Sequence, residues 1–146
     1  MAEATREIVI QATPDHFYGI ITGFRSYPEF VPDVVKTRIV SEGPLQWRVE
    51  FTLKIIKEIS YTLDLTGVPG KGITWKLAEP GSIIRSNVGA WELTDLGGGK
   101  LNAKYVANVD VAIPRLIPGA SAIVSRLIGS SLPAMLEAFK GRAEKK

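Results

Sequence analysis

The stretch FRSYPEFVPDVVKTRIV, residues 24–40, joins two different periodicities within a short length of chain. Pro28 and Pro32 interrupt any continuous helix, because proline lacks a backbone N–H and fixes φ. After Pro32, apolar and polar residues alternate with period two, which is typical of a half-buried β-strand. The stretch therefore predicts a corner where short helical structure gives way to a sheet.

The segment before this corner predicts one strand and one short helix. Residues 6–11 alternate in polarity, which indicates a first strand. Thr13 is a favourable N-cap, and Pro14 suits the first helical position. We expect a second short helix near Tyr27 to Val31, with the aromatic side chains there forming either an apolar lip to a pocket or ordinary core packing.

The rest of the chain predicts six antiparallel strands followed by one long helix. Period-two alternation runs from residue 35 to residue 111, with turn sequences such as TGVPGKG (66–72) and DLGGGK (95–100) between the strands. Beyond it the apolar residues follow a helical period. One face of this predicted amphipathic helix carries Val124, Leu127, Ile128, Leu132, Met135, Leu136 and Phe139. Such a sheet coils strongly, and one helix covers only part of its concave face, so we expect a cavity between them.

Length and composition predict a single domain over residues 1–146. Hydrophobic residues make up 45% and charged residues 23% of the chain, as in ordinary globular proteins. The chain has no cysteine, and its N-terminus lacks the pattern of a signal peptide, so we expect a cytoplasmic location. Arginines and prolines interrupt the apolar region 111–136, so we expect no membrane-spanning helix there.

Three stretches resemble the START/Bet v 1-like (SRPBCC) superfamily: SYPEFVPDVVKTRIV (26–40), GAWELTDLGGGKLNAKYVANVDV (89–111) and LPAMLEAFKGRA (132–143). More narrowly, the sequence resembles the polyketide cyclase/dehydrase and lipid-transport family, near the coenzyme Q-binding and ribosome-association toxin branch. The resemblance implies an α+β helix-grip fold, in which a curved antiparallel sheet of about seven strands wraps around a long C-terminal helix.

Polar and aromatic side chains on the inward face of the expected sheet form the candidate ligand-binding site. By unbroken alternation, Arg85 and Asn87 share a face with Trp91, although a β-bulge before Gly89 would leave Arg85 in solvent. Thr37 also has inward parity. Each aromatic residue is by itself more often core than ligand wall, but together they exceed what one helix covers. The predicted ligand-binding residues are Tyr27, Phe30, Tyr61, Trp75, Arg85, Asn87, Trp91, Tyr105, Leu132 and Met135.

Little in the sequence supports metal, cofactor or nucleophilic chemistry. The one histidine, His16, begins a predicted helix and has no second ligand at metal spacing. No GxSxG motif is present, and GVPGKG and GGGK lack the Ser or Thr that follows lysine in phosphate loops. We therefore expect neither a cofactor nor a metal.

The sequence favours binding or transport of a hydrophobic small molecule, such as a lipid, an isoprenoid or quinone, or a polyketide-like ring system. An alternative is an aromatase/cyclase-type enzyme that uses Tyr61, Tyr105 and Arg85. A second alternative is an interaction protein that contacts a ribosome or membrane through its basic C-terminal tail. The net charge is only +3, and we expect no direct nucleic-acid binding.

Overall fold

The computed structural model describes residues 2–54, 58–80, 84–111 and 131–145. The predicted order of one strand, short helices, six strands and a C-terminal helix is confirmed. Its elements are β1 (Ala2–Ile10), α1 (Pro14–Ile21), η1 (Phe24–Ser26), α2 (Tyr27–Phe30), β2 (Val34–Glu42), β3 (Gln46–Lys54), β4 (Glu58–Val68), β5 (Gly72–Leu77), β6 (Ile84–Gly97), β7 (Lys100–Val111) and α4 (Ser131–Glu144). The predicted helical residues Val124, Leu127 and Ile128 lie outside the described residues.

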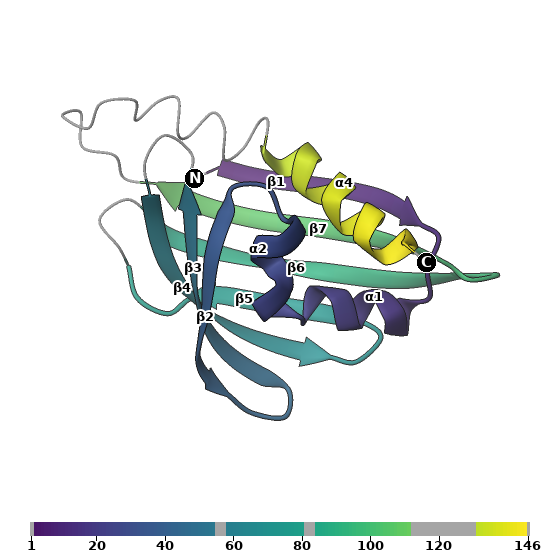
Figure 1. Cartoon of the computed structure of the whole chain (residues 1–146), viewed down its shortest axis with the longest axis horizontal. Coiled ribbons are helices and arrows are strands. Elements are labelled where there is room, and N and C mark those ends of the chain that lie inside the picture. Colours follow the sequence, from purple (N-terminus) through teal and green to yellow (C-terminus); the bar gives the residue numbers. More distant parts are fainter. Residues whose placement is uncertain (1, 55–57, 81–83, 112–130, 146) are drawn as a thin grey trace.

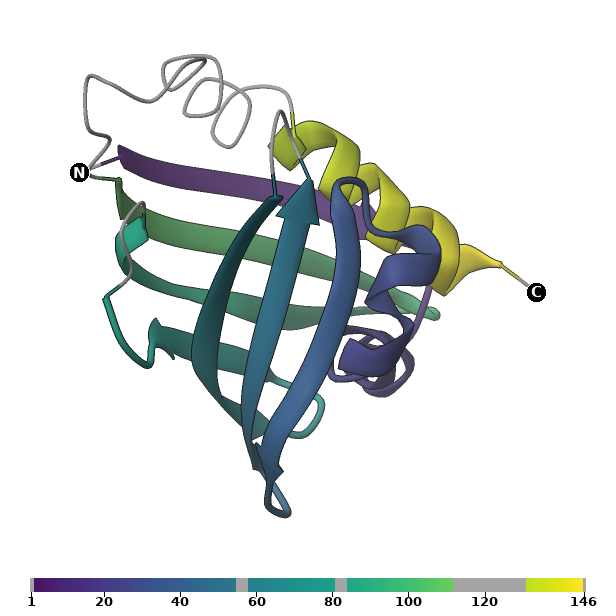
Figure 2. The ribbon, with the colours of Figure 1, turned by 60° about the vertical axis from the view of Figure 1, so that its left-hand side comes forward.

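The strands form one antiparallel sheet in the order β1-β7-β6-β5-β4-β3-β2. The sheet coils so strongly that β2, β3 and β4 run at a steep angle to β1 and β7 (Figure 2). Helices α1, α2 and α4 all lie on its concave side (Figure 1). This arrangement is the predicted α+β helix-grip fold.

Helix α1 begins where the sequence predicts. The Thr13 hydroxyl accepts a hydrogen bond from the His16 backbone N–H at 3.2 Å, and Pro14 occupies the first turn. The helix buries Phe17 and Ile21 against the sheet side and exposes its polar residues. Its orientation brings Phe17 beneath the C-terminal helix, since the Phe17 and Phe139 ring centroids lie 6.4 Å apart.

The corner in residues 24–40 is fixed by hydrogen bonds to both of its sides. The Val31 backbone N–H donates to the Tyr27 carbonyl at 2.8 Å, which closes the single turn of α2. Asp33 then adopts a left-handed conformation, with φ of 68°, that an aspartate tolerates better than most side chains. The Lys54 N–H donates to the Asp33 carbonyl at 2.8 Å and ties the corner to β3.

Helix α4 attaches to the sheet through a stripe of apolar residues at helical spacing. Leu132, Leu136, Phe139 and Ala143 are buried, and Pro133 is exposed, as the helical pattern predicts. The Phe139 ring is at the centre of this contact, because it packs edge-on against aromatic rings from α1, α2 and β6. Helix α4 therefore forms one wall of the space between itself and the concave face of the sheet.

Candidate functional site

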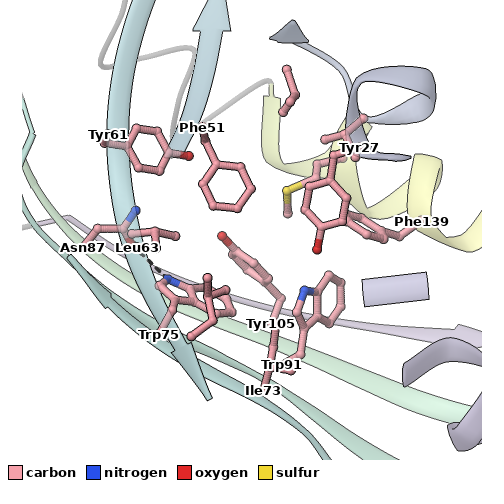
Figure 3. Close-up of a pocket in the computed structure, with 14 residues that line it drawn as sticks. Tyr27, Phe51, Tyr61, Leu63, Ile73, Trp75, Asn87, Trp91, Tyr105 and Phe139 are labelled. Carbon is pink, nitrogen blue, oxygen red and sulfur yellow. Dashed lines mark hydrogen bonds between the residues drawn. The ribbon is translucent and has the colours of Figure 1, made fainter. Parts of the chain in front are cut away.

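A partly open cavity of about 100 Å³ lies between the concave face of the sheet and helices α2 and α4 (Figure 3). Side chains from the sheet extend toward one another, and Tyr27 and Phe139 face them from the helical side. The lining consists of Tyr27, Val31, Val34, Phe51, Tyr61, Leu63, Leu65, Ile73, Trp75, Asn87, Trp91, Tyr105, Met135 and Phe139. None of these described lining residues carries a formal charge.

The aromatic side chains of the cavity hold one another in place. Tyr105 lies between two tryptophans, with ring centroids 5.5 Å from Trp75 and 5.1 Å from Trp91. On the opposite wall, Phe51 stacks on Tyr61 at 5.7 Å. Edge-to-face and offset contacts of this kind stabilise the rings beyond their burial, so the cavity wall is preorganised.

The Trp75 ring packs closely against the backbone of the neighbouring strand because Gly89 has no side chain. Trp75 and Gly89 are directly paired between β5 and β6. A Cβ atom on Gly89 would lie 2.4 Å from a carbon of the Trp75 ring and 2.5 Å from the Val106 carbonyl oxygen. In this position the indole Nε1 of Trp75 donates a hydrogen bond to Oδ1 of Asn87 at 3.0 Å.

Three tyrosine hydroxyls belong to the cavity, and they differ in their partners. The Tyr27 hydroxyl donates to the backbone carbonyl of Ile21. Within the described part of the chain, the hydroxyls of Tyr61 and Tyr105 have no hydrogen-bond partner. Burial raises the pKa of Tyr61 to about 12 and raises the pKa of Tyr105 further, the latter also because Tyr61 is close. Both phenols are therefore neutral at physiological pH.

Alkaline titration should show this burial directly. All four tyrosines of the chain have a pKa above the ordinary value of 10.0, and desolvation is the largest cause for each. We expect the folded protein to show little tyrosinate absorbance at pH 10, where the denatured chain is half ionised. Because ionisation favours the unfolded chain first, the free energy of unfolding should fall as pH rises from about 10 toward 12. A folded-state titration that matches the denatured one would contradict the burial of these phenols.

Most of the predicted ligand-binding residues line the cavity, namely Tyr27, Tyr61, Trp75, Asn87, Trp91, Tyr105 and Met135. Two others lie beside it, Leu132 in the core and Phe30 partly buried at the edge of the core. Leu132 is 5% exposed, and the Phe30 ring packs on Phe139 at 5.2 Å and beneath the Arg142 guanidinium at 5.0 Å. At the corner, Tyr27 therefore serves as both core and cavity wall, whereas Phe30 packs against the edge of the core and does not line the cavity.

The structure corrects the expectation that Arg85 points inward. Arg85 is exposed, whereas its neighbour Ile84 is 4% exposed. The pairing of β6 with β7 shifts register between Ile84 and Ser86, which is the β-bulge that the sequence left open as an alternative. One extra residue exchanges the two faces of the strand, so Arg85 is on the outer face while Asn87 remains inward.

Sequence reasoning did not select several residues that line the cavity: Val34, Phe51, Leu63, Leu65, Ile73 and Phe139. The alternation of polarity places most of them on inward faces, but it does not show which inward positions border the space. Thr37 was also expected on an inward face, but it does not line the cavity. Its hydroxyl donates to the Phe24 carbonyl at 2.8 Å and holds the corner against β2.

Other kinds of site find no support in the described residues. Among them, no group of three His, Cys, Asp or Glu side chains could hold a metal ion. His16 contacts the Ala143 carbonyl oxygen through Nε2 at 3.1 Å, which joins α1 to the end of α4. In the described part of the chain, no helix has the length and apolar character needed to cross a membrane.

Comparison with known proteins identifies the family and the fold. A family model described as polyketide cyclase/dehydrase and lipid transport matches residues 1–144. Among curated proteins, none matches significantly. Solved structures with similar folds include the Zhui aromatase/cyclase from Streptomyces, with a TM-score of 0.87, 17% identity, and coverage of 98% of this chain and 93% of that one.

Two further solved structures share the fold at low sequence identity. A START superfamily protein from Mycobacterium smegmatis has a TM-score of 0.79 and 19% identity, and the match covers 97% of both chains. A STAR-related lipid transfer protein from Xanthomonas axonopodis has a TM-score of 0.77 and 12% identity, with coverage of 98% of this chain and 86% of that one. The helix-grip fold is therefore common to proteins described as an enzyme and as a lipid transfer protein.

Proposed function

The chain belongs to the polyketide cyclase/dehydrase and lipid transport family, as its sequence motifs predicted, and we propose that it binds a hydrophobic small molecule in the cavity between the sheet and α4. The composition of the cavity lining is the observation that supports this proposal. It is dominated by aromatic and aliphatic side chains, and its few polar groups are neutral. Mostly apolar cavities with a few convergent polar groups are the usual form of small-molecule sites.

The size of the cavity restricts what it can hold without rearrangement. Its volume of about 100 Å³ is below the roughly 300–1,000 Å³ of typical ligand sites. Benzene occupies a cavity of roughly 150 Å³, so even a single ring would fill this space completely and extend into its open side. A longer ligand would require lining side chains to move, and the flexible Met135 is the most adaptable of them. We therefore place one ring, or one end of a chain, inside.

An aromatase/cyclase-type activity is the second candidate, because a solved enzyme of that description has this fold. The hydroxyls of Tyr61 and Tyr105 could donate hydrogen bonds to a carbonyl-rich chain. Their raised pKa values keep both hydroxyls protonated at neutral pH, however, so neither is available as a base, and the described lining contains no carboxylate, histidine or lysine that could remove a proton. We therefore favour ligand binding without turnover over aromatase/cyclase activity. Contact with a ribosome or membrane stays a prediction, as does the branch within the family.

Filling the cavity provides the test of this proposal. We expect native mass spectrometry of purified wild-type protein to detect a retained small molecule that solvent extraction releases and identifies. Leu63→Phe places extra volume into the cavity and should abolish retention. Val88→Phe is the matched control, because Val88 is on the same sheet but is 51% exposed, so retention should not change. Equal retention by wild type and a folded Leu63→Phe variant would rule out this cavity as the site.

A further inference from the structure

The hydrogen bond between Trp75 and Asn87 determines which polar atom of Asn87 is available to a ligand. An amide side chain offers one acceptor oxygen and one donor nitrogen. The indole nitrogen of Trp75 is only a donor, so its 3.0 Å contact must be with the amide oxygen. Oδ1 of Asn87 is thereby engaged by the wall, and the Nδ2 amino group is the end that remains for the cavity (Figure 3).

The other polar groups of the cavity are also able to donate. Nε1 of Trp91 has no acceptor among the described residues, and an indole N–H cannot accept a hydrogen bond. The neutral hydroxyls of Tyr61 and Tyr105 likewise have no partner in the described part of the chain. The third phenol, Tyr27, already donates to the Ile21 carbonyl. Two obligate donors and two adaptable hydroxyls therefore surround one small apolar space.

The described residues that line the cavity provide these hydrogen-bond donors but no charged side chain. Burying a carboxylate without a cationic partner is very unfavourable, and Arg85 is exposed on the other face of β6. A hydrocarbon would leave the N–H groups of Trp91 and Asn87 without acceptors. A carbonyl oxygen suits this lining better than either, because it carries no charge and gives an acceptor to at least one of these N–H groups.

Building on the proposed binding function, we propose that the cavity selects neutral ring ligands bearing a carbonyl oxygen, which accepts a hydrogen bond from Trp91 Nε1 or, at the other side of the Trp75 ring, from Asn87 Nδ2. Fatty-acid and other carboxylate head groups are excluded from it. Trp75 has a separate role as a positioning residue, since it orients the Asn87 amide without needing to touch the carbonyl oxygen itself.

Three probes of the same shape test the selectivity: acetophenone, α-methylstyrene and benzoate. They have the same number of non-hydrogen atoms and differ in whether the ring substituent ends in a ketone, a hydrocarbon or a carboxylate. The chain has three tryptophans, and their indole N–H resonances can be followed by ¹H–¹⁵N NMR. Acetophenone should move the Trp91 resonance downfield, α-methylstyrene should bind without this downfield shift, and benzoate should bind at least about tenfold more weakly than acetophenone.

Variants separate hydrogen bonding from simple packing. Trp91→Phe and Trp75→Phe should each lower the ratio of acetophenone to α-methylstyrene affinity, by roughly fivefold or more for Trp91→Phe. Phe51→Leu is the control, because Phe51 lines the cavity without a polar group, and it should change both affinities together. The Trp47 resonance is an internal reference, since Trp47 packs on Phe24 and is not one of the residues that line the cavity.

The outcomes distinguish this inference from the proposed function on which it rests. If the probes bind but the affinity ratio is unchanged in both tryptophan variants, or if benzoate binds as tightly as acetophenone, the selectivity is wrong while cavity binding stands. If none of the probes perturbs any cavity resonance in any folded variant, both the selectivity and binding in this cavity are rejected.

Discussion

Gly89→Ala is expected to destabilise the protein by about 3 kcal/mol or more, a large effect for the addition of one methyl group. The new Cβ would lie 2.4 Å from the Trp75 ring and 2.5 Å from the Val106 carbonyl oxygen. The ring could rotate away only by leaving its place against Tyr105, and the carbonyl belongs to the backbone of β7. Either movement disrupts the central strands and removes the hydrogen bond to Asn87.

Chemical denaturation of the variant beside a matched control would measure this effect. Gly141→Ala is the control, because a Cβ on Gly141 meets nothing within 4 Å and the residue is exposed in α4. Alanine favours a helix over glycine, so this variant should gain about 0.5–1 kcal/mol. Similar free energies of unfolding for the two variants would show that β6 accommodates a side chain beneath Trp75.

The fold could be predicted because its boundaries are set by local chemistry. Each of the signals acts over a few residues. They are the Thr13 cap, the two prolines of the corner, and the change in the spacing of apolar residues from a helical period to period two. None of these signals depends on which distant residues come into contact. The order of elements follows from them, and an antiparallel sheet of this length has few ways to pack against one helix.

The position of Arg85 could not be predicted, because it depends on register between strands. The bulge exists where β6 pairs with β7, between the Ile84–Val111 and Ser86–Asp110 pairs, and nothing in the local sequence of β6 specifies it. Gly89 was a reasonable indicator of a bulge, yet its role in the structure is to admit the Trp75 ring. A glycine in a strand is thus compatible with two different causes, and only the neighbouring strand distinguishes them.

The cavity was predicted in kind but not in its full lining. Alternation gives the inward face of each strand, whereas the curvature of the sheet decides which inward residues meet at the open space. Phe139 shows the difference clearly. Its place on the apolar face of the helix was predicted, but its position beside Tyr27 and Trp91 depends on where α4 crosses the sheet.

Phe139→Ala is expected to cost about 3–5 kcal/mol of unfolding free energy, because it removes a large side chain that is only 2% exposed. The ring joins four others, with centroid distances of 6.4 Å to Phe17, 5.3 Å to Tyr27, 5.2 Å to Phe30 and 5.5 Å to Trp91. Truncation therefore loosens α4 from α1, α2 and β6 together.

The loss of unfolding free energy in Phe139→Ala can be compared with that of a neighbouring truncation, measured in the same way. Phe30→Ala removes an identical side chain, but Phe30 is only partly buried and packs on Phe139 from the outer side, beneath Arg142. We expect its cost in urea denaturation to be about half that of Phe139→Ala or less, since the cost of truncation rises with the buried volume left empty. Equal costs for the two variants, or a cost below about 1 kcal/mol for Phe139→Ala, would mean that α4 is held to the sheet by contacts other than this aromatic cluster.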